Sequence, residues 1–527
     1  MSTSGSSGGS NLRSARVVAA GLLLSKPTGY IRDALLAARF GTGPAMDAYT
    51  LAYTAATAAF DLVGTPLQKV LVPVLVRARE RRGAPGLAAT SESVLWAAAA
   101  VSLLIGALLL LCAGPLAGAL TGKGAAAAPT AALIRWLSPF PLGLTLSVYA
   151  SGWLQAGEHF ALPAFVGLPF DFAVIGFVLG GHPHGVLAAV WGLIVGAFLQ
   201  YALQWPGLRR FGHRVRLPAP GDALRDPGLR STAAMALPLL ISAGSIQAVN
   251  VLQQALASRL AAGDSAALLY AYRVLDVPSA LFILPVITVL GPQLAARFAS
   301  ANPAAAAAVL TDAAWALAAG LLPSALLIAL LASPLAAALF EHGAFGHASV
   351  QAMAAALAGF GAAVLTSGMQ QLVRSAFYAA QDARTPMLWD VVAFVVTAVF
   401  DALAYRVWHQ FGLALGFALG PAVAWIGLTV SFRRRYGRVP GGRRFLLSLA
   451  AGGGALAAVV LGLQGRVPAF LGHTPWHVGL AQILLRGAGG SVAYVAVVLT
   501  TGGGPMLGHL IGGVRARVRA DPVRRGA

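Results

Sequence analysis

The sequence contains few charged residues and almost no cysteine. Of its 527 residues, 10% are Asp, Glu, Lys or Arg and 58% are hydrophobic, and the mean hydropathy is +0.75. This composition excludes an ordinary soluble globular domain, in which about 25% of residues are charged. The single cysteine, Cys112, lies in an apolar run. One cysteine excludes an intrachain disulfide and a cysteine metal cluster, so we expect Cys112 to serve packing.

The motifs of nucleotide-hydrolysing and metal-dependent enzymes are also missing. The pair Gly122-Lys123 has neither the upstream glycine nor the following Ser or Thr of a phosphate-binding loop, which argues against direct ATP hydrolysis. The ten histidines show no metal-ligand spacing, so no metal or other cofactor is predicted. Residues 1–10 are rich in Gly and Ser and lack the pattern of a signal peptide, and we expect residues 1–11 to form a disordered tail.

Long apolar runs dominate the rest of the chain. A helix needs about 20 apolar residues to cross the hydrocarbon layer, and the sequence contains about fourteen such runs. The predicted fold is therefore an all-α polytopic membrane protein with about 14 transmembrane helices. The expected spans are 12–38, 48–76, 92–113, 127–156, 161–180, 185–206, 231–261, 265–296, 304–334, 349–380, 385–406, 410–432, 444–465 and 478–503.

Positive charge is distributed unevenly between these spans. A net charge of +20 would suit a nucleic-acid-binding protein, but the basic residues gather in alternate connections, and nucleic acid is not an expected partner. Basic connections mark the cytoplasmic side, so both termini are expected to be cytoplasmic, as an even number of spans requires. We interpret the clusters at 433–438 and 515–519 as topology determinants, with contact to anionic membrane lipids as the alternative.

The chain shows a weak internal repeat. The segment starting Leu71-Val-Pro closes the second span and resembles the segment starting Leu290-Gly-Pro, which closes the eighth. Residues 151–163 likewise resemble residues 375–386. Both pairs join elements of the same orientation, which predicts a parallel repeat, as in transporters whose substrate lies between two rocking halves.

Two long basic connections, at 207–231 and 433–443, divide the spans into blocks of six, six and two. We therefore expect two six-helix lobes in parallel repeat and two extra C-terminal helices. The predicted parts are a tail at 1–11, an N-lobe at 12–230, a C-lobe at 231–440, two further helices at 441–510 and a basic cytoplasmic tail at 511–527.

Several charged side chains lie inside predicted spans, where they are costly unless they face protein or a wet cavity. Arg273 and Asp276 are three residues apart, on one helical face, so a local ion pair is the alternative to a functional site. Lys26 and Arg32 lie about 120° apart around the first helix, so both can border one wide cavity. The alternative is that Lys26 extends to the membrane interface and Arg32 pairs with Asp33.

Carboxylates complete this predicted charged chamber. Asp47 lies in a setting comparable to that of Lys26 and Arg32. Each further intramembrane carboxylate is open to two interpretations, helix–helix hydrogen bonding and coupling to an ion. These residues are Asp61, Asp171, Asp390 and Asp401.

The first helix, Ser25-Lys-Pro-Thr-Gly-Tyr-Ile-Arg-Asp, resembles the opening of the MurJ/MviN lipid II flippases, members of the multidrug/oligosaccharidyl-lipid/polysaccharide exporter superfamily. Tyr270-Ala-Tyr-Arg resembles the Tyr-Ala-Asp-Arg segment of the family. The segments Phe340–Phe345 and Arg374–Pro386 resemble two further signatures. The resemblance covers nearly the whole chain.

The resemblance implies an alternating-access flippase, not an enzyme. It would move undecaprenyl-pyrophosphate-linked peptidoglycan precursor, lipid II, from the inner to the outer leaflet of the bacterial cytoplasmic membrane. The residues at 444–465 and 478–503 would form a groove for the polyprenyl tail. By position, the family's cavity residues fall on Lys26, Arg32, Asp47, Arg273 and Asp276. Arginine side chains suit such a substrate because they bind phosphates through paired hydrogen bonds.

Two departures from the family affect these expectations. An Arg-Arg-x-Phe-Ala-Glu-Gly stretch of the family reads Ala59-Phe-Asp-Leu-Val-Gly-Thr65 here, so one cavity arginine and the glutamate are absent. Lys69 would replace part of the lost positive charge from elsewhere on the helix. A sodium site of some members would fall near Thr397 and Asp401, but Gln253 stands at the position of its acidic partner. Na+ or the membrane potential is the expected driving force.

Other functions remain open. The lost arginine favours a flippase for another lipid-linked oligosaccharide, or a divergent non-transporting paralogue in cell-wall assembly. A membrane-embedded glycosyltransferase or acyltransferase would need polar catalytic residues at a membrane face, whereas the long loops here are rich in arginine and poor in carboxylates. Expected partners are lipid II or a related lipid-linked glycan, membrane lipids and the cell-wall synthesis machinery.

Overall fold

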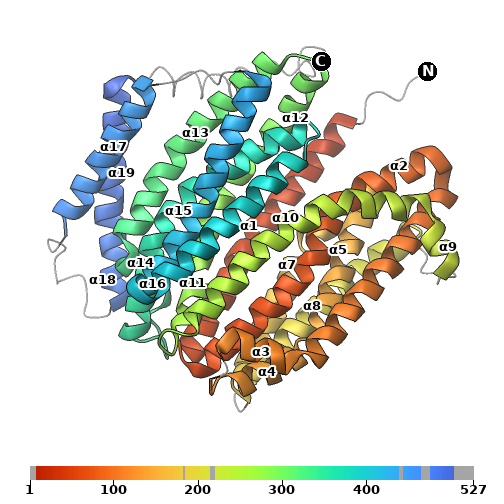
Figure 1. Ribbon diagram of the computed structural model, residues 1–527, viewed down its shortest axis with the longest axis horizontal. Helices are drawn as coiled ribbons and strands as arrows, with labels where there is room; N and C mark the ends of the chain where they lie inside the picture. The colour runs from red at the N-terminus through yellow and green to blue at the C-terminus, as the bar shows by residue number, and fades with distance from the viewer. Residues whose placement is uncertain are drawn as a thin grey trace. The chain divides into compact units, whose positions relative to one another are not determined.

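The computed structural model describes residues 7–122, 124–181, 184–213, 220–437, 443–464 and 475–503, and over these residues the regular structure is helical throughout. The prediction of an all-α fold is therefore confirmed. Contacts between Cα atoms group the chain into two compact units, residues 1–266 and 267–527. Each unit is described by itself below (Figure 1).

Unit 1 contains the helices from α1 to α10 and the start of α11. They are α1 (Ser7–Phe40), α2 (Pro44–Leu111), α3 (Ala113–Thr121), α4 (Ala127–Trp136), α5 (Phe140–Ala156), α6 (Ala161–Ala164), α7 (Gly167–Gly180), α8 (Val186–Arg210), α9 (Pro220–Arg225), α10 (Pro227–Ala257) and the first residues of α11 (Asp264–Pro278).

Unit 2 contains the rest of α11 and three short π-helical turns. Its further elements are η2 (Ser279–Ile283), α12 (Leu284–Ala299), α13 (Pro303–Leu330), α14 (Ala332–Phe340), α15 (His347–Ala379), α16 (Arg384–Tyr436), α17 (Arg443–Gly462), α18 (Pro475–Gln482), η4 (Ile483–Gly487), α19 (Ala488–Val498) and η5 (Leu499–Gly503).

Among the described residues, ten helical stretches are long and apolar enough to cross a membrane. Two of them, α2 and α16, are each interrupted by one residue with non-helical backbone angles, so each covers two predicted spans. The two remaining predicted spans coincide with α1 and with α7, a shorter apolar helix. The prediction of about fourteen spans is consistent with this arrangement.

The two legs of α2 are joined at Gly83, whose φ of 65° favours glycine. Next to this turn, Arg82 donates through Nη1 to Asp226 Oδ1 at 2.8 Å, and Thr90 Oγ1 donates to Asp226 Oδ2 at 3.1 Å. Asp226 also caps α10 by accepting from the Leu229 N–H. Burial raises the pKa of Asp226, but the hydrogen bonds from Arg82, Leu229 and Thr90 outweigh it and hold the pKa below its usual range.

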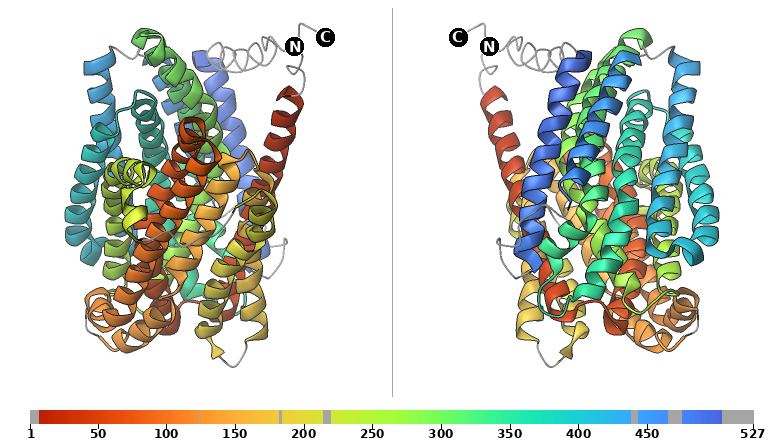
Figure 2. Two further views of the ribbon diagram at one scale, coloured as in Figure 1. Left: turned by 90° about the vertical axis from the view of Figure 1, so that its right-hand side faces the viewer. Right: turned by 90° about the vertical axis from the view of Figure 1, so that its left-hand side faces the viewer.

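Each unit has its own apolar core. In unit 1, Leu71, Leu75 and Leu154 pack around the buried Tyr149. In unit 2, a hairpin of α17 with α18 and α19 lies beside α13 (Figure 2). Tyr494 of α19 packs in this core and donates its hydroxyl to the Ala319 carbonyl of α13 at 3.0 Å. The two extra C-terminal helices are thus part of the packed body of unit 2.

The predicted lobe boundary at residues 230 and 231 remains a prediction. Helix α10 packs along α2 within unit 1, so the contact units divide about one helix later. Helix α1 begins at Ser7, inside the segment predicted as a tail over residues 1–11. Residues 1–6 and the predicted basic tail at 511–527 lie outside the described residues.

Candidate functional site

Helix α1 contains Pro27 in its interior, where proline removes one backbone N–H, and Arg32 follows it. Thr28, the residue after Pro27, donates through Oγ1 to Asp171 Oδ2 of α7 at 3.0 Å. Arg32 follows on the same stretch and donates through Nη1 to Asp171 Oδ1 at 2.8 Å. A threonine and an arginine of α1 therefore share one carboxylate of a neighbouring helix.

A second carboxylate completes the environment of Arg32. Arg32 donates through Nε to Asp33 Oδ1 at 2.9 Å and through Nη2 to the same oxygen at 2.8 Å. Its guanidinium carbon also lies 5.5 Å from the centroid of the Phe170 ring. Arg32 thus pairs with Asp33, as the alternative interpretation of the sequence predicted, and it also pairs with Asp171. A half-buried cation with two carboxylates is compensated electrically, which makes its place inside a span tolerable.

Lys26 lies on the exposed part of α1, six residues before Arg32. Gly29 lies between them, and a Cβ atom at this position would stand 3.5 Å from Asp171 Oδ2, in ordinary contact. The contact of Lys26 and Arg32 with a substrate phosphate remains a prediction.

Asp47 is buried at the start of α2 and holds the beginning of α11. Its Oδ2 accepts the Gly263 N–H at 2.6 Å, and its Oδ1 accepts the Ala266 N–H at 2.9 Å. Gly263 has a φ of 96°, which favours glycine. Both carboxylate oxygens thus satisfy amides that a helix start leaves without intrahelical partners. The role of Asp47 at the substrate stays a prediction, because these hydrogen bonds do not test it.

In unit 2, Arg273 and Asp276 are half-buried on α11, three residues apart. Two tyrosines anchor this helix. Tyr270 is buried with its ring centroid 5.4 Å from that of Phe340, and Tyr272 stands edge-on to Phe417 at 5.4 Å. Aromatic packing of Tyr270 and Tyr272 therefore fixes α11 just before Arg273.

The two other signature segments also have structural roles. Tyr270 contacts Phe345 as well as Phe340, so the segment Phe340–Phe345 packs directly on α11. In the other segment, Arg374 donates through Nη2 to Asp390 Oδ1 at 2.5 Å, and Gln370 Nε2 donates to the same oxygen at 3.1 Å. Asp390 thus forms helix–helix hydrogen bonds, the first of the two interpretations, and these bonds join α15 to α16.

Asp382 lies between α15 and α16 and contacts residues at both ends of α16. It accepts the N–H groups of Arg384 and Thr385 at the helix start, each at 3.0 Å. Arg435, near the other end of α16, pairs with it at 2.5 Å. Burial raises the pKa of Asp382, but the hydrogen bonds from Thr385 and the charge of Arg435 outweigh burial and hold the pKa below its usual range.

The predicted ion-coupling residues lie together on the first leg of α16. Asp401 is 0% exposed, and Thr397 Oγ1, one turn earlier, donates to the Gly416 carbonyl of the second leg at 3.2 Å. A Cβ atom on Gly416 would collide with the Asp401 carboxylate, and one on Gly420 would collide with the Thr397 hydroxyl. The two legs approach closely because glycines face these polar side chains.

The described residues contain no group of three or more His, Cys, Asp or Glu side chains placed to hold a metal ion. Sequence reasoning missed two partners in the charged clusters. Asp171 and Asp390 were recognised as costly, but their pairing with Arg32 and Arg374 depends on contacts 139 and 16 residues apart in sequence. It also missed Arg486, a buried arginine in the last hairpin, although an arginine within an apolar span was a visible signal.

Comparison with known proteins places this arrangement in a family. The sequence model of the family described as lipid II flippase MurJ matches residues 36–482. The lipid II flippase MurJ of Burkholderia cenocepacia is 29% identical over 454 residues, covering 83% of this chain and 87% of that protein. A probable lipid II flippase MurJ of Vibrio cholerae is 23% identical over 517 residues, covering 93% of this chain and 96% of the relative.

Solved structures support the fold. A lipid II flippase MurJ in an inward closed conformation superposes with a TM-score of 0.76 at 17% identity, covering 92% of this chain and 98% of that one. An inward-facing multidrug resistance MATE transporter of the MOP superfamily gives 0.63 at 14% identity, covering 78% and 94%. At these identities the likeness establishes the fold only. Because the family model matches most of this chain, the chain belongs to the lipid II flippase MurJ family.

Proposed function

We propose that this protein is an alternating-access flippase that moves lipid II from the inner to the outer leaflet of the cytoplasmic membrane. The observation that carries the proposal is the family match over residues 36–482. The fold of a multi-pass membrane transporter and the intramembrane arginines agree with it. The protein would act as a transporter and not as an enzyme.

Lys26, Arg32 and Arg273 are proposed to contact the pyrophosphate during the transport cycle. A pyrophosphate carries several negative charges, and a guanidinium binds it through two parallel hydrogen bonds. Arg32 already holds such a planar interaction with carboxylates, since its Nη1 meets Asp171 and its Nε and Nη2 meet Asp33. The substrate would compete with Asp171 for Nη1.

This competition offers a way to release the substrate. When Asp171 regains Nη1, the positive charge that held the pyrophosphate is compensated again. Asp276 lies one turn from Arg273 and is proposed to serve Arg273 in a similar way. Binding and release would thus follow from an exchange of partners and need no change of protonation.

The driving force is proposed to be the membrane potential or Na+. Hard cations prefer oxygen ligands, and the Asp401 carboxylate, the Thr397 hydroxyl and the Gly416 carbonyl supply three within unit 2. These residues fit a sodium ion. Gln253 stands where the family has an acidic ligand, which favours the membrane potential.

The location and the other partners follow from the same reasoning. The alternating basic connections support a cytoplasmic position of both termini in the bacterial cytoplasmic membrane. Membrane lipids and the cell-wall synthesis machinery are the proposed partners beside lipid II.

A second candidate is a flippase for another lipid-linked oligosaccharide. The residues Ala59–Thr65 lack the second-helix arginine of the family, and Asp61 in this segment instead accepts from Gln247 Nε2 at 2.7 Å. A changed cavity charge would suit a changed head group. The identity of the lipid that accumulates on depletion separates the two candidates.

The proposed contacts are tested in a cell whose growth depends on this gene alone. Arg32→Ala and Arg273→Ala are expected to abolish growth, because each removes a guanidinium from the proposed phosphate contacts. Arg135→Ala is the matched control, since Arg135 is an exposed arginine in α4. All three variants must reach wild-type abundance in the membrane. Normal growth of both Arg32→Ala and Arg273→Ala would reject this role.

A further inference from the structure

The C-terminal hairpin contains a buried arginine that the proposed transport steps do not use. Arg486 lies in the π-helical turn η4 and is 5% exposed. A single π turn inside an α-helix is frequently associated with a functional site. An arginine is rarely buried to this degree without a negatively charged partner.

Within the described part of the chain, Arg486 makes hydrogen bonds only to neutral groups. Its Nε donates to the Val460 carbonyl of α17 at 3.0 Å, and its Nη1 donates to Gln482 Oε1 at 3.1 Å. A guanidinium has five N–H donors, so three of them have no protein acceptor within the part of the chain that the structure describes. The buried positive charge therefore has no counterion among these residues.

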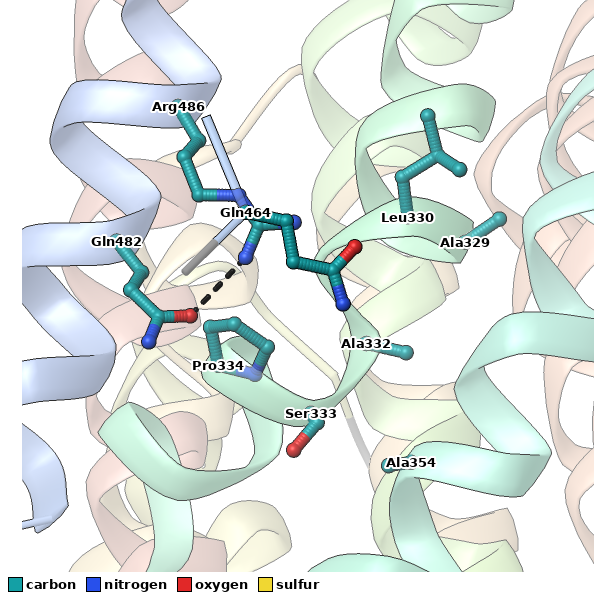
Figure 3. Close-up of a pocket in the computed structure, with 9 residues that line it drawn as sticks. All are labelled: Ala329, Leu330, Ala332, Ser333, Pro334, Ala354, Gln464, Gln482 and Arg486. Carbon is teal, nitrogen blue, oxygen red and sulfur yellow. Dashed lines mark hydrogen bonds between the residues drawn. The ribbon is translucent and has the colours of Figure 1, made fainter. Parts of the chain in front are cut away.

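A cavity of about 400 Å³ adjoins this guanidinium (Figure 3). Arg486 and Gln482 project into it from the hairpin, Gln464 reaches it from the end of α17, and Ser333 lies at its edge on α14. No Asp or Glu is among the described residues that line it. The volume is that of a small-ligand pocket, for which about 300 to 1,000 Å³ is usual.

The surroundings of the cavity suit an amphiphilic ligand. Beside its polar residues, the lining is apolar and includes Leu330, Pro334 and Ala354. In the predicted topology, the end of α17 and the start of α18 lie at the outer face of the membrane. An apolar lining next to a buried cation at this depth matches a lipid, with the phosphate at Arg486 and apolar parts of the lipid against Leu330 and Pro334.

We propose that the cavity between α14, α17 and α18 binds the phosphate of an anionic membrane lipid, and that Arg486 provides the charge that binds it. The amide groups of Gln464 and Gln482 and the hydroxyl of Ser333 add hydrogen-bonding partners for the head group. The site does not depend on the proposed flippase activity. It would attach the hairpin to the outer leaflet through a bound lipid.

Native mass spectrometry of the purified, delipidated full chain tests the proposal. Phosphatidylglycerol is added as the anionic probe and phosphatidylcholine as the zwitterionic one. The wild type is expected to bind phosphatidylglycerol more tightly, and Arg486→Gln is expected to weaken that binding about tenfold, because a charge-assisted hydrogen bond is lost. Arg135→Gln, which removes an exposed arginine elsewhere, should leave it unchanged.

Ser333→Phe is a second variant that fills the cavity and leaves Arg486 in place. It covers the case in which Arg486→Gln does not fold, and it should also weaken phosphatidylglycerol binding. A polyprenyl pyrophosphate is a third probe, and a stronger Arg486-dependent preference for it would identify the transported lipid, not the bulk lipid, as the source of the phosphate. Equal binding of every probe to the wild type and to the folded variants would overturn the proposal.

Discussion

At the scale of single residues, two intramembrane arginines lie in clusters in which carboxylates compensate their charge. Arg32 meets Asp33 and Asp171, and Arg374 meets Asp390. Each guanidinium would be costly alone inside a span, so its partner lowers the cost of placing it there. Arg32 was predicted from the sequence because its charge is conspicuous in an apolar run. The identity of its partner on α7 was not predictable, since only the fold brings residues 32 and 171 together.

The Arg32–Asp171 pair should show energetic coupling. Arg32→Ala, Asp171→Ala and the double variant are compared by thermal unfolding in one detergent. Because each partner stabilises the other, the double variant should lose less than the sum of the single losses, with a coupling of about 0.5 to 3 kcal/mol. Arg32 with Asp61 is the matched control, because Asp61 contacts Gln247 and not Arg32. Additive losses for the Arg32–Asp171 pair would contradict the observed contact.

A buried histidine outside the spans should make stability depend on pH. His213 Nε2 lies 2.8 Å from the Tyr149 hydroxyl. Because this hydroxyl donates its own proton to the Ser91 carbonyl, the hydrogen bond between the two side chains requires a proton on His213 Nε2. Burial lowers the pKa of His213 to about 4 from its ordinary 6.5. The unfolded chain therefore binds a proton below pH 6.5 that the folded chain resists, and stability should fall as the pH drops from 6.5 to about 4.

The measurement compares thermal unfolding at pH 7.5 and pH 5. His213→Gln removes this titration and should lose less stability between the two pH values than the wild type. His184→Gln is the control, because it removes an exposed histidine for which the described residues show no acidic partner. If His213→Gln loses as much stability as the wild type, the buried neutral histidine is not the cause.

At the scale of helices, the length and composition of the apolar runs predicted where helices lie. Contacts with other parts of the chain determine where these helices begin and end. Runs of about 20 apolar residues located the spans well, since the bilayer demands that length. The span predicted over 265–296 corresponds to one continuous helical stretch, Asp264–Ala299, which consists of α11, η2 and α12. The start of α11 depends on Asp47, which is 216 residues from Gly263. A cap supplied from so far along the chain has no local sequence signal.

Close helix contacts through glycine give a test at this scale. Gly192 of α8 faces α7 so closely that a Cβ atom would stand 2.6 Å from the Val174 Cα, which is backbone. Gly192→Ala should therefore destabilise the protein by about 1 to 3 kcal/mol in a thermal unfolding assay. Gly176→Ala on α7 is the matched control, because nothing lies within 4 Å of its added Cβ and alanine favours the helix. Equal effects of the two substitutions would contradict the packing.

At the scale of the whole molecule, the sequence and the family match support one another. Composition predicted a polytopic helical protein, and the family model places it among the lipid II flippase MurJ proteins. The parallel repeat and the lobe boundaries remain predictions. The proposed phosphate contacts are distributed over both units, with Lys26 and Arg32 in one and Arg273 in the other.

The most direct test of this account is the leaflet distribution of lipid II in cells that lack any second flippase. The protein is depleted, and the lipid II that an externally added probe can reach is measured against the total. We predict that the reachable fraction falls while lipid II accumulates in the cytoplasmic leaflet, and that wild-type protein restores the distribution whereas Arg273→Ala does not. An unchanged reachable fraction after depletion would contradict the proposal that this chain moves lipid II across the membrane.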